Sequence, residues 1–236
     1  MKMYLIIASI AVSAAFTSCS NKVQLLKTIT YEDDSYTEFE YDNQNRITKM
    51  SKYSTNEDFN KTQTLTYSGN DLVRIVSEVF YLNDDEEYTK SGNIIRSSTG
   101  YTIELDNDGY PTKRERASEG FSFVTTYQYQ SGNLTKVSFK QMWDDFITGE
   151  GITEYKYDNM KSPFLYCKTP KWYFICVIDN SIQNNITEKN HMYNKVEYTY
   201  EYEYNNAGFP TKMTMTDKYY DEVTVLTFQY VQVKNK

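Results

Sequence analysis

The sequence predicts an all-β protein, a long antiparallel meander of about 12–16 strands that is strongly curled or closed into a barrel-like sheet. Three observations predict it: an aromatic-rich composition, strict alternation of aromatic and polar residues, and a recurring hairpin pattern. The 236 residues include 24 tyrosines and 12 phenylalanines, against nine glycines and four prolines. Such a composition is typical of strands. So many strands in one open twisted sheet would curl, split or close.

The clearest alternation is in Val196–Tyr204, which reads VEYTYEYEY. The valine and the four tyrosines share one parity, and the glutamates and the threonine share the other. Successive side chains of a strand point to opposite faces, so the stretch is predicted as a strand with one aromatic and one acidic face. A helix would spread the tyrosines around its circumference. We expect the tyrosine-rich face to point inward, and the Thr, Glu, Gln and Lys face to point outward.

A hairpin pattern recurs seven times along the chain. Each copy has an alternating strand, a polar turn and a second strand that begins with an apolar residue. Several turns contain Ser-Gly-Asn or Asn-Asp-Gly, which supply the positive φ angles of tight hairpins. A last strand is expected near the C-terminus. The turns lie near residues 42–45, 68–71, 91–93, 106–109, 131–133, 158–159 and 205–210, the last strand at 223–233, and acidic tips of the opposite connections at 33–34, 84–87 and 144–145.

The insert at residues 160–190 breaks this rhythm. Its central part, residues 163–178, is nearly all apolar or aromatic and includes Trp172. Exposed, it would be an aggregation hazard, so we expect it to pack across the aromatic face as a plug or lid. Periodicity does not decide between a hairpin and a short helix. In a hairpin, Cys167 and Cys176 could form a disulfide; the alternative is two buried free thiols.

The N-terminus predicts export. Lys2 precedes an apolar stretch at residues 5–16, which is too short to span a bilayer but suits a signal peptide. Phe16-Thr17-Ser18-Cys19 resembles a bacterial lipobox, in which Cys19 would be lipidated. The alternative is an ordinary secretory signal with a nearby free cysteine. The predicted organisation is a lipoprotein signal peptide, an N-terminal tether and a single β-meander domain, at residues 1–18, 19–26 and 27–236.

Charge and motif content predict neither nucleic-acid binding nor catalysis. The net charge is −7 with dispersed acidic residues, whereas nucleic acids need a basic footprint. His191 is the single histidine and is expected in a solvated loop, without the partners of a catalytic or metal site. Residues 104–115 match the spacing of an EF-hand loop, but strand-like flanks favour a hairpin turn. We therefore predict no enzyme activity, no cofactor and no metal site.

Several of these motifs together resemble known repeats and a known family. The Tyr-Asp-Asn and Gly-Phe-Pro-Thr-Lys hairpins at residues 157–159 and 208–212 resemble YD-type (RHS-like) repeats. With the lipobox, the motif at 157–164 and Asn184-Asn185-Ile186-Thr187, the chain resembles a family of bacterial lipoproteins of unknown function with a porin-like β fold. The resemblance covers residues 25–233. It implies a curled or closed antiparallel sheet, and it implies no activity or functional residue.

We expect a non-catalytic cell-envelope lipoprotein that serves as a binding or scaffolding module for a glycan, peptide or lipid. The alternative is a carrier of lipid or another hydrophobic ligand on the concave tyrosine-rich face. Lipidated Cys19 would attach the chain to a membrane, with the periplasmic face of the outer membrane slightly favoured. An integral barrel is disfavoured because neither strand face is continuously apolar. The residues predicted to face a ligand are Tyr198, Tyr200, Tyr202 and Trp172.

Overall fold

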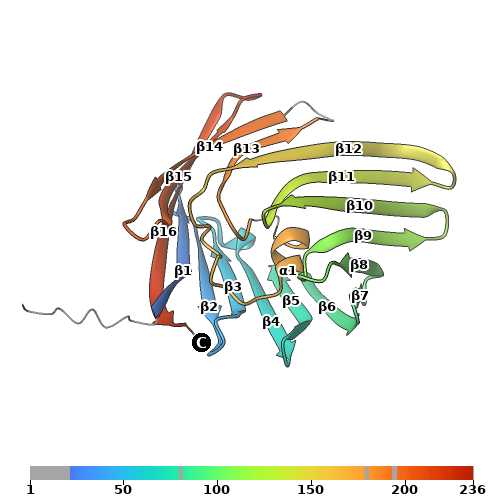
Figure 1. Ribbon diagram of the computed structural model, residues 1–236, viewed down its shortest axis with the longest axis horizontal. Coiled ribbons are helices and arrows are strands. Elements are labelled where there is room, and N and C mark those ends of the chain that lie inside the picture. The colour runs from blue at the N-terminus through green and yellow to red at the C-terminus, as the bar shows by residue number, and fades with distance from the viewer. Residues whose placement is uncertain (1–21, 80–81, 179–180, 193–195, 236) are drawn as a thin grey trace, which may run out of the picture.

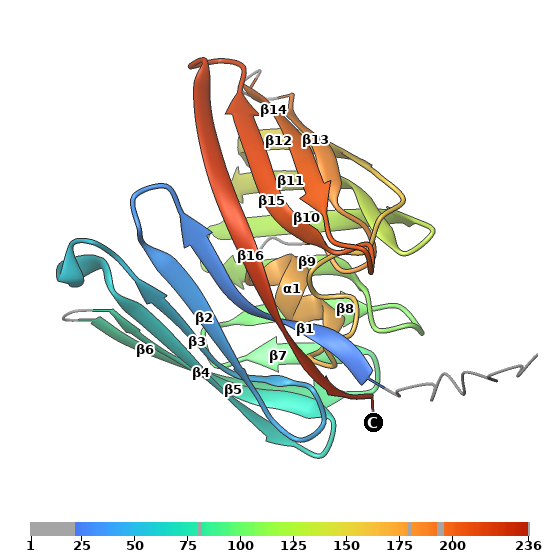
Figure 2. The same ribbon diagram turned by 90° about the vertical axis from the view of Figure 1, so that its left-hand side faces the viewer.

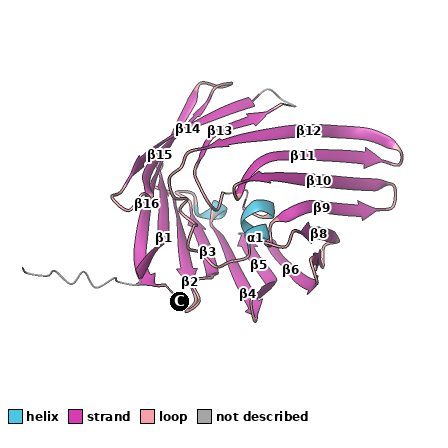
Figure 3. Ribbon diagram, viewed as in Figure 1, coloured by secondary structure: helices cyan, strands magenta, loops and turns pink. Residues whose placement is uncertain are grey.

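The computed structural model describes residues 22–79, 82–178, 181–192 and 196–235. Within these ranges, sixteen antiparallel strands form one closed barrel, in which each strand pairs with its neighbours in the chain and β16 pairs with β1 (Figure 1). The predicted antiparallel meander is therefore confirmed, and of the two alternatives, a curled or a closed sheet, the structure has the closed one. Helical structure in the described residues is limited to the 3-10 turn η1 and the short helix α1 (Figure 3). No described helix has the length and apolar character needed to cross a bilayer.

The elements are β1 (Lys22–Tyr31), β2 (Tyr36–Tyr41), β3 (Ile47–Tyr53), η1 (Glu57–Phe59), β4 (Lys61–Ser68), β5 (Asp71–Val79), β6 (Leu82–Ser91), β7 (Ile94–Ser97), β8 (Tyr101–Leu105), β9 (Pro111–Ser118), β10 (Phe121–Gln130), β11 (Asn133–Trp143), β12 (Phe146–Tyr157), α1 (Lys171–Cys176), β13 (Ile186–His191), β14 (Val196–Tyr204), β15 (Pro210–Asp217) and β16 (Glu222–Lys234).

The connections between strands alternate between two ends of the barrel. Those that follow even-numbered strands lie at one end, together with the start of β1, the end of β16 and the long segment 158–185; we call this the plug end. The described connections that follow odd-numbered strands form the opposite end, which we call the rim. Figures 1 and 2 show α1, within the long segment, inside the ring of strands.

A ladder of tyrosines holds the plug end together. Among the described residues, six even-numbered strands each carry a tyrosine whose hydroxyl donates to a backbone carbonyl of the preceding strand, at 2.7–2.9 Å. The pairing register shifts at every acceptor residue. A bulge disturbs the regular ladder of backbone hydrogen bonds, and the tyrosine supplies a donor there. The pairs are Tyr41–Leu26, Tyr67–Ile47, Tyr129–Pro111, Tyr157–Leu134, Tyr202–Ile186 and Tyr230–Pro210.

The seam between β16 and β1 repeats this geometry without a connecting turn. Tyr230 lies opposite Leu26, and the register shifts directly after that pair, as it does in the hairpins. In the described residues the same shift occurs in β2–β3, β4–β5, β8–β9, β10–β11, β12–β13 and β14–β15, whereas β6–β7 pairs without one. The hairpin predicted with its turn at 158–159 is wrong, because a long segment that contains α1 separates β12 from β13 in the chain. Pairing at the seam begins at Lys22 opposite Lys234. Residues 22–26, predicted as tether, are thus part of the barrel, because β16 provides them with a strand partner.

The two faces of the sheet differ as the alternation predicts. The inward parity supplies the hydrophobic core, including Phe39, Leu65, Ile103 and Tyr155. The outward parity carries charged pairs such as Lys212–Glu203. One prediction about the acidic stretches is wrong: residues 84–87 lie within β6 instead of at a tip, because Asp85 pairs across the strands with Arg74.

Candidate functional site

At its plug end, the lumen contains residues 158–178 and 181–185, which join β12 to β13. A ring of about sixteen strands is wide enough to leave a channel when only its own side chains fill it. Here aromatic residues of the segment occupy that space: Trp172 is 3% exposed, and Tyr173 and Phe174 are both fully buried. Phe174 packs on Phe164 of the same segment, with ring centroids 4.9 Å apart. We call the described part of this segment, residues 158–178 and 181–185, the plug.

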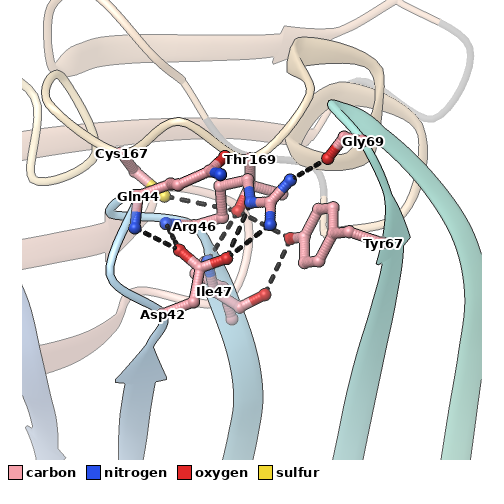
Figure 4. Close-up of polar contacts among 8 residues, drawn as sticks. All are labelled: Asp42, Gln44, Arg46, Ile47, Tyr67, Gly69, Cys167 and Thr169. Carbon is pink, nitrogen blue, oxygen red and sulfur yellow. Dashed lines mark hydrogen bonds and ion pairs between the residues drawn. The ribbon is translucent and has the colours of Figure 1, made fainter. Parts of the chain in front are cut away.

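Thr169 joins the plug to the bulge at the start of β3 (Figure 4). Its hydroxyl oxygen accepts from the Ile47 N–H at 2.8 Å and lies 3.0 Å from the Tyr67 hydroxyl. Tyr67 donates its single proton to the Ile47 carbonyl at 2.7 Å, so Thr169 donates to the Tyr67 oxygen. Arg46, held by Asp42, stacks 4.2 Å from the centre of the Tyr67 ring. The plug thus uses the backbone donor that the bulge makes available.

Two further contacts join α1 to the barrel wall. The Tyr173 hydroxyl donates to the side-chain oxygen of Gln63 on β4 at 3.2 Å. On the β9 side, Arg114 donates through Nη1 to the carbonyl of Cys176 at 3.1 Å, and its guanidinium lies 3.9 Å from the centre of the Tyr101 ring. A cation at the last carbonyls of a helix is favourable. The helix is therefore held from both sides of the lumen.

The motif residues near 158 and 185 close the plug on itself. The carboxylate of Asp158 accepts from the backbone N–H of Asn185 at 3.1 Å and from its side-chain amide at 3.1 Å. It also accepts from the Tyr204 hydroxyl. The Asn184 side-chain oxygen accepts from Asn133 at the β10–β11 turn, at 2.9 Å. These motif residues therefore bring the two ends of the plug together and attach them to the barrel.

Cys167 and Cys176 are free thiols in the structure. The segment between them contains α1 instead of a hairpin, and each thiol meets a different partner: Thr169 for Cys167 and Tyr127 for Cys176, both at 3.5 Å. Burial raises the pKa of both thiols, that of Cys176 to about 11. Of the two alternatives left open above, the structure thus contains the free thiols.

A chamber lies on the rim side of the plug. It has two lobes, one of about 290 Å³ and one of about 220 Å³. The lobes share Ile29, Tyr31 and Phe164 in their walls, so they meet across these side chains. Most of the remaining wall is aliphatic or aromatic. We call the two lobes together the lumenal chamber.

The larger lobe lies between the first four strands and the plug. Phe39 and Met50 form part of its wall, and Val177 of the plug closes one side. Lys52 and Lys61 also line it, and these two residues are directly opposite each other in the pairing of β3 with β4. The Lys52 ammonium lies 5.4 Å from the centre of the Tyr31 ring. An apolar lobe with two ammonium groups in its wall suits an amphipathic molecule.

The smaller lobe lies between β13–β16 and the plug. Tyr200 and Tyr202 line it, together with Phe228 and Lys189. The Tyr202 hydroxyl is engaged in the ladder at 2.9 Å from the Ile186 carbonyl. Burial raises the pKa of Tyr202, so this hydroxyl stays protonated as a donor at neutral pH.

The four residues predicted to face a ligand do not lie together. Tyr198 shares the inward parity with Tyr200 and Tyr202, but it contacts His191 and is not part of the wall of either lobe. Trp172 packs on Tyr88, with ring centroids 4.8 Å apart, and lines a separate plug-end cavity of about 460 Å³. The two lysines of the larger lobe were not predicted. Their signal in the sequence is that Lys61 shares the parity of Gln63, Leu65 and Tyr67.

Two other candidates have structural roles. His191 was expected in a loop, but it ends β13 and its Nδ1 lies 2.8 Å from the Thr153 hydroxyl, because strand pairing continues to this residue. Asp106 accepts from the backbone N–H groups of Asp108 and Tyr110, both at 2.9 Å, as a turn residue does. Within the described ranges, no group of three His, Cys, Asp or Glu side chains could hold a metal ion.

Comparison with known proteins gives a likeness of structure alone. No protein family and no curated protein matches the chain. A porin-like protein from Bacteroides uniformis is similar in structure over 89% of this chain and 97% of that one, with 13% identity and a TM-score of 0.40. A porin-like protein from Bacteroides vulgatus is similar over 89% and 99%, with 12% identity and a TM-score of 0.44. At these scores, the assignment of the fold rests on the strand pairing described above.

Proposed function

We propose that the protein is a non-catalytic binding module of the bacterial cell envelope, and that its lumenal chamber takes up a small hydrophobic ligand. The observation that carries the proposal is a pair of adjoining lobes lined largely by aromatic and aliphatic side chains above the plug. Small-molecule sites are typically concave and mostly apolar, with volumes from about 300 Å³ upward. The lobes, of about 290 and 220 Å³, reach that range when both are occupied.

The plug supports a receptor that is closed at one end. Its buried aromatic residues, Trp172, Tyr173 and Phe174, fill the plug end of the lumen. A ligand would therefore enter from the rim and come to rest against Phe164 and Val177, which form the floor of the chamber. This arrangement favours uptake and release over passage through the barrel. No specific observation favours a purely scaffolding role.

We further propose that the chain is attached to a membrane at its plug end. Cys19 lies outside the described residues, but in the sequence it is only three positions before Lys22, where β1 begins at that end. A lipid on Cys19 would therefore lie within about 11 Å of the barrel. Charged pairs such as Lys156–Glu188 cover the outer face, and charge facing lipid is destabilising. The barrel would then stand on the membrane, on the periplasmic side of the outer membrane, with its rim facing away.

Titration with the neutral fluorescent probe N-phenyl-1-naphthylamine tests the proposal. We expect saturable binding at one site, and weaker binding for Val177→Trp, which fills the larger lobe. Val177 is 37% exposed, and Val231, which lies on the outer parity of β16, is 38% exposed. Val231→Trp is therefore a matched control that should bind as the wild type does. Absence of saturable binding, or equal binding by Val177→Trp and the wild type, would contradict the proposal.

A further inference from the structure

We infer that the ligand of the lumenal chamber carries an anionic head group, and that Lys52 and Lys61 hold it. This inference rests on the proposed function and names the class of its ligand: a small amphiphile with an apolar tail and a carboxylate, sulfonate or phosphate. The tail would lie against Met50, Phe39 and Phe164, all in the wall of the same lobe.

The first step is the position of the two lysines. They are directly opposite each other where β3 and β4 pair, and both line the larger lobe. Side chains opposite each other in an antiparallel pair have Cβ atoms about 5 Å apart. Like charges at such positions are destabilising. Repulsion between the two ammonium groups thus destabilises the folded protein, and a bound anion would reduce that repulsion.

The second step is the lack of a neutralising carboxylate. In the described part of the chain, neither Lys52 nor Lys61 makes an ion pair, whereas five lysines on the outer face do so at 2.5–3.7 Å. These are Lys27, Lys49, Lys113, Lys156 and Lys212. The charge of Lys52 contributes to a lowered pKa of Asp33, after the larger contribution of hydrogen bonds from Ser35, but the ammonium and this carboxylate form no ion pair. The barrel thus pairs these outer lysines and leaves the two chamber lysines available.

The third step concerns the side chains that surround Lys52 and Lys61. The Lys52 ammonium stacks on Tyr31, a residue shared by both lobes, which keeps the charge beside the apolar wall. Gln63, on the same face of β4, is engaged with Tyr173 and Ser77, so it supports the wall and does not compete for an anion. An oxyanion between the two ammonium groups would accept charge-assisted hydrogen bonds from both.

Competition against the fluorescent probe by three amphiphiles that share a twelve-carbon chain tests the head group. We expect dodecanoate to bind more tightly than dodecanol, and dodecyltrimethylammonium to bind most weakly. Lys52→Gln and Lys61→Gln should each weaken dodecanoate binding about two- to fivefold, as expected for exposed charge pairs, and should leave dodecanol unchanged. Lys49→Gln is the matched control: it removes one charge from the opposite face of β3, where Lys49 pairs with Glu40.

Thermal unfolding without ligand gives a second readout. Because each glutamine variant removes a like-charge repulsion, we expect Tm to rise by about 1–2 °C. Added dodecanoate should then stabilise the wild type more than either variant. Equal binding of dodecanoate and dodecanol, tighter binding of the cationic amphiphile, or a lower Tm in both variants would overturn the anionic head group while leaving the chamber intact. If neither the probe nor any amphiphile binds, the proposed function itself fails.

Discussion

The plug end and the rim are formed by the same sixteen strands of the described chain, yet aromatic side chains are buried at the plug end and exposed at the rim. At the plug end, Phe164, Tyr173 and Phe174 are at most 1% exposed. At the rim, Phe146 is 76% exposed and Tyr220 is 66% exposed. Most other exposed large hydrophobic residues of the described chain are also at the rim: Tyr36, Tyr53, Phe59, Leu82, Trp143, Ile147, Met192, Tyr219 and Val223.

The two ends differ in how deeply aromatic residues are buried because of the plug and the bulges, and not because of the strands themselves. The alternation continues along each strand, but among the described residues the second layer of side chains that fills the lumen lies at the plug end. The tyrosine ladder, whose hydroxyls bond to carbonyls at the register shifts, lies at that end as well. The plug end is therefore the stabilising half of the barrel, and the rim half keeps the space for a ligand.

Truncation of a plug aromatic should have the largest effect. Phe174 is fully buried and packs on Phe164, so Phe174→Ala should lower the free energy of unfolding by about 3–5 kcal/mol. The control is Phe146→Ala at the rim, which should change it by less than about 0.5 kcal/mol. Urea unfolding of both variants measures the difference. Similar losses in the two variants would show that the plug does not stabilise the barrel.

Removal of one ladder hydroxyl should have an intermediate effect. Tyr67→Phe leaves the Ile47 carbonyl without its donor and takes a partner from Thr169. Because an unsatisfied buried polar group costs about 1–3 kcal/mol, we expect a loss of that size. Tyr219→Phe, at an exposed rim position, should leave stability unchanged within about 0.5 kcal/mol. Denaturant midpoints for the two variants compare the ends directly, and equal midpoints would mean that the ladder contributes nothing.

Much of the barrel could be predicted because strand alternation and turn motifs each depend on only two to six neighbouring residues of the sequence. The two-residue period of Val196–Tyr204 identifies β14 and its faces, and Ser-Gly-Asn turns identify the β4–β5, β6–β7 and β10–β11 hairpins. The ladder could not be predicted in this way, because the carbonyl that each hydroxyl reaches depends on a bulge in another strand. The run at 84–87 looked like a loop because the salt bridge from Arg74 to Asp85 is a tertiary contact.

The candidate site was predicted only in part. Tyr200 and Tyr202 reach the chamber because they share the inward parity with the rest of β14. Trp172 was grouped with them by its aromatic character, but the path of the plug carries it to the other side. Lys52 and Lys61 are nine residues apart across the connection that includes η1, and their alignment depends on how that connection turns. Sequence parity alone does not give this register.

A pH titration should show the smallest effect, and it concerns the plug end alone. Burial acts to raise the pKa of Asp42, but hydrogen bonds from Arg46 and Gln44 outweigh burial and hold it below its ordinary value of 3.8. A carboxyl whose pKa is lower in the folded state stabilises the fold above its unfolded pKa, and this contribution is lost as pH falls through the folded value. Urea unfolding between pH 6 and pH 3 should therefore show a smaller acid-induced loss for Asp42→Asn than for the wild type, by about 1 kcal/mol or less. If Asp42→Asn follows the wild-type curve, the Asp42–Arg46 contact does not contribute to the greater stability of the plug end.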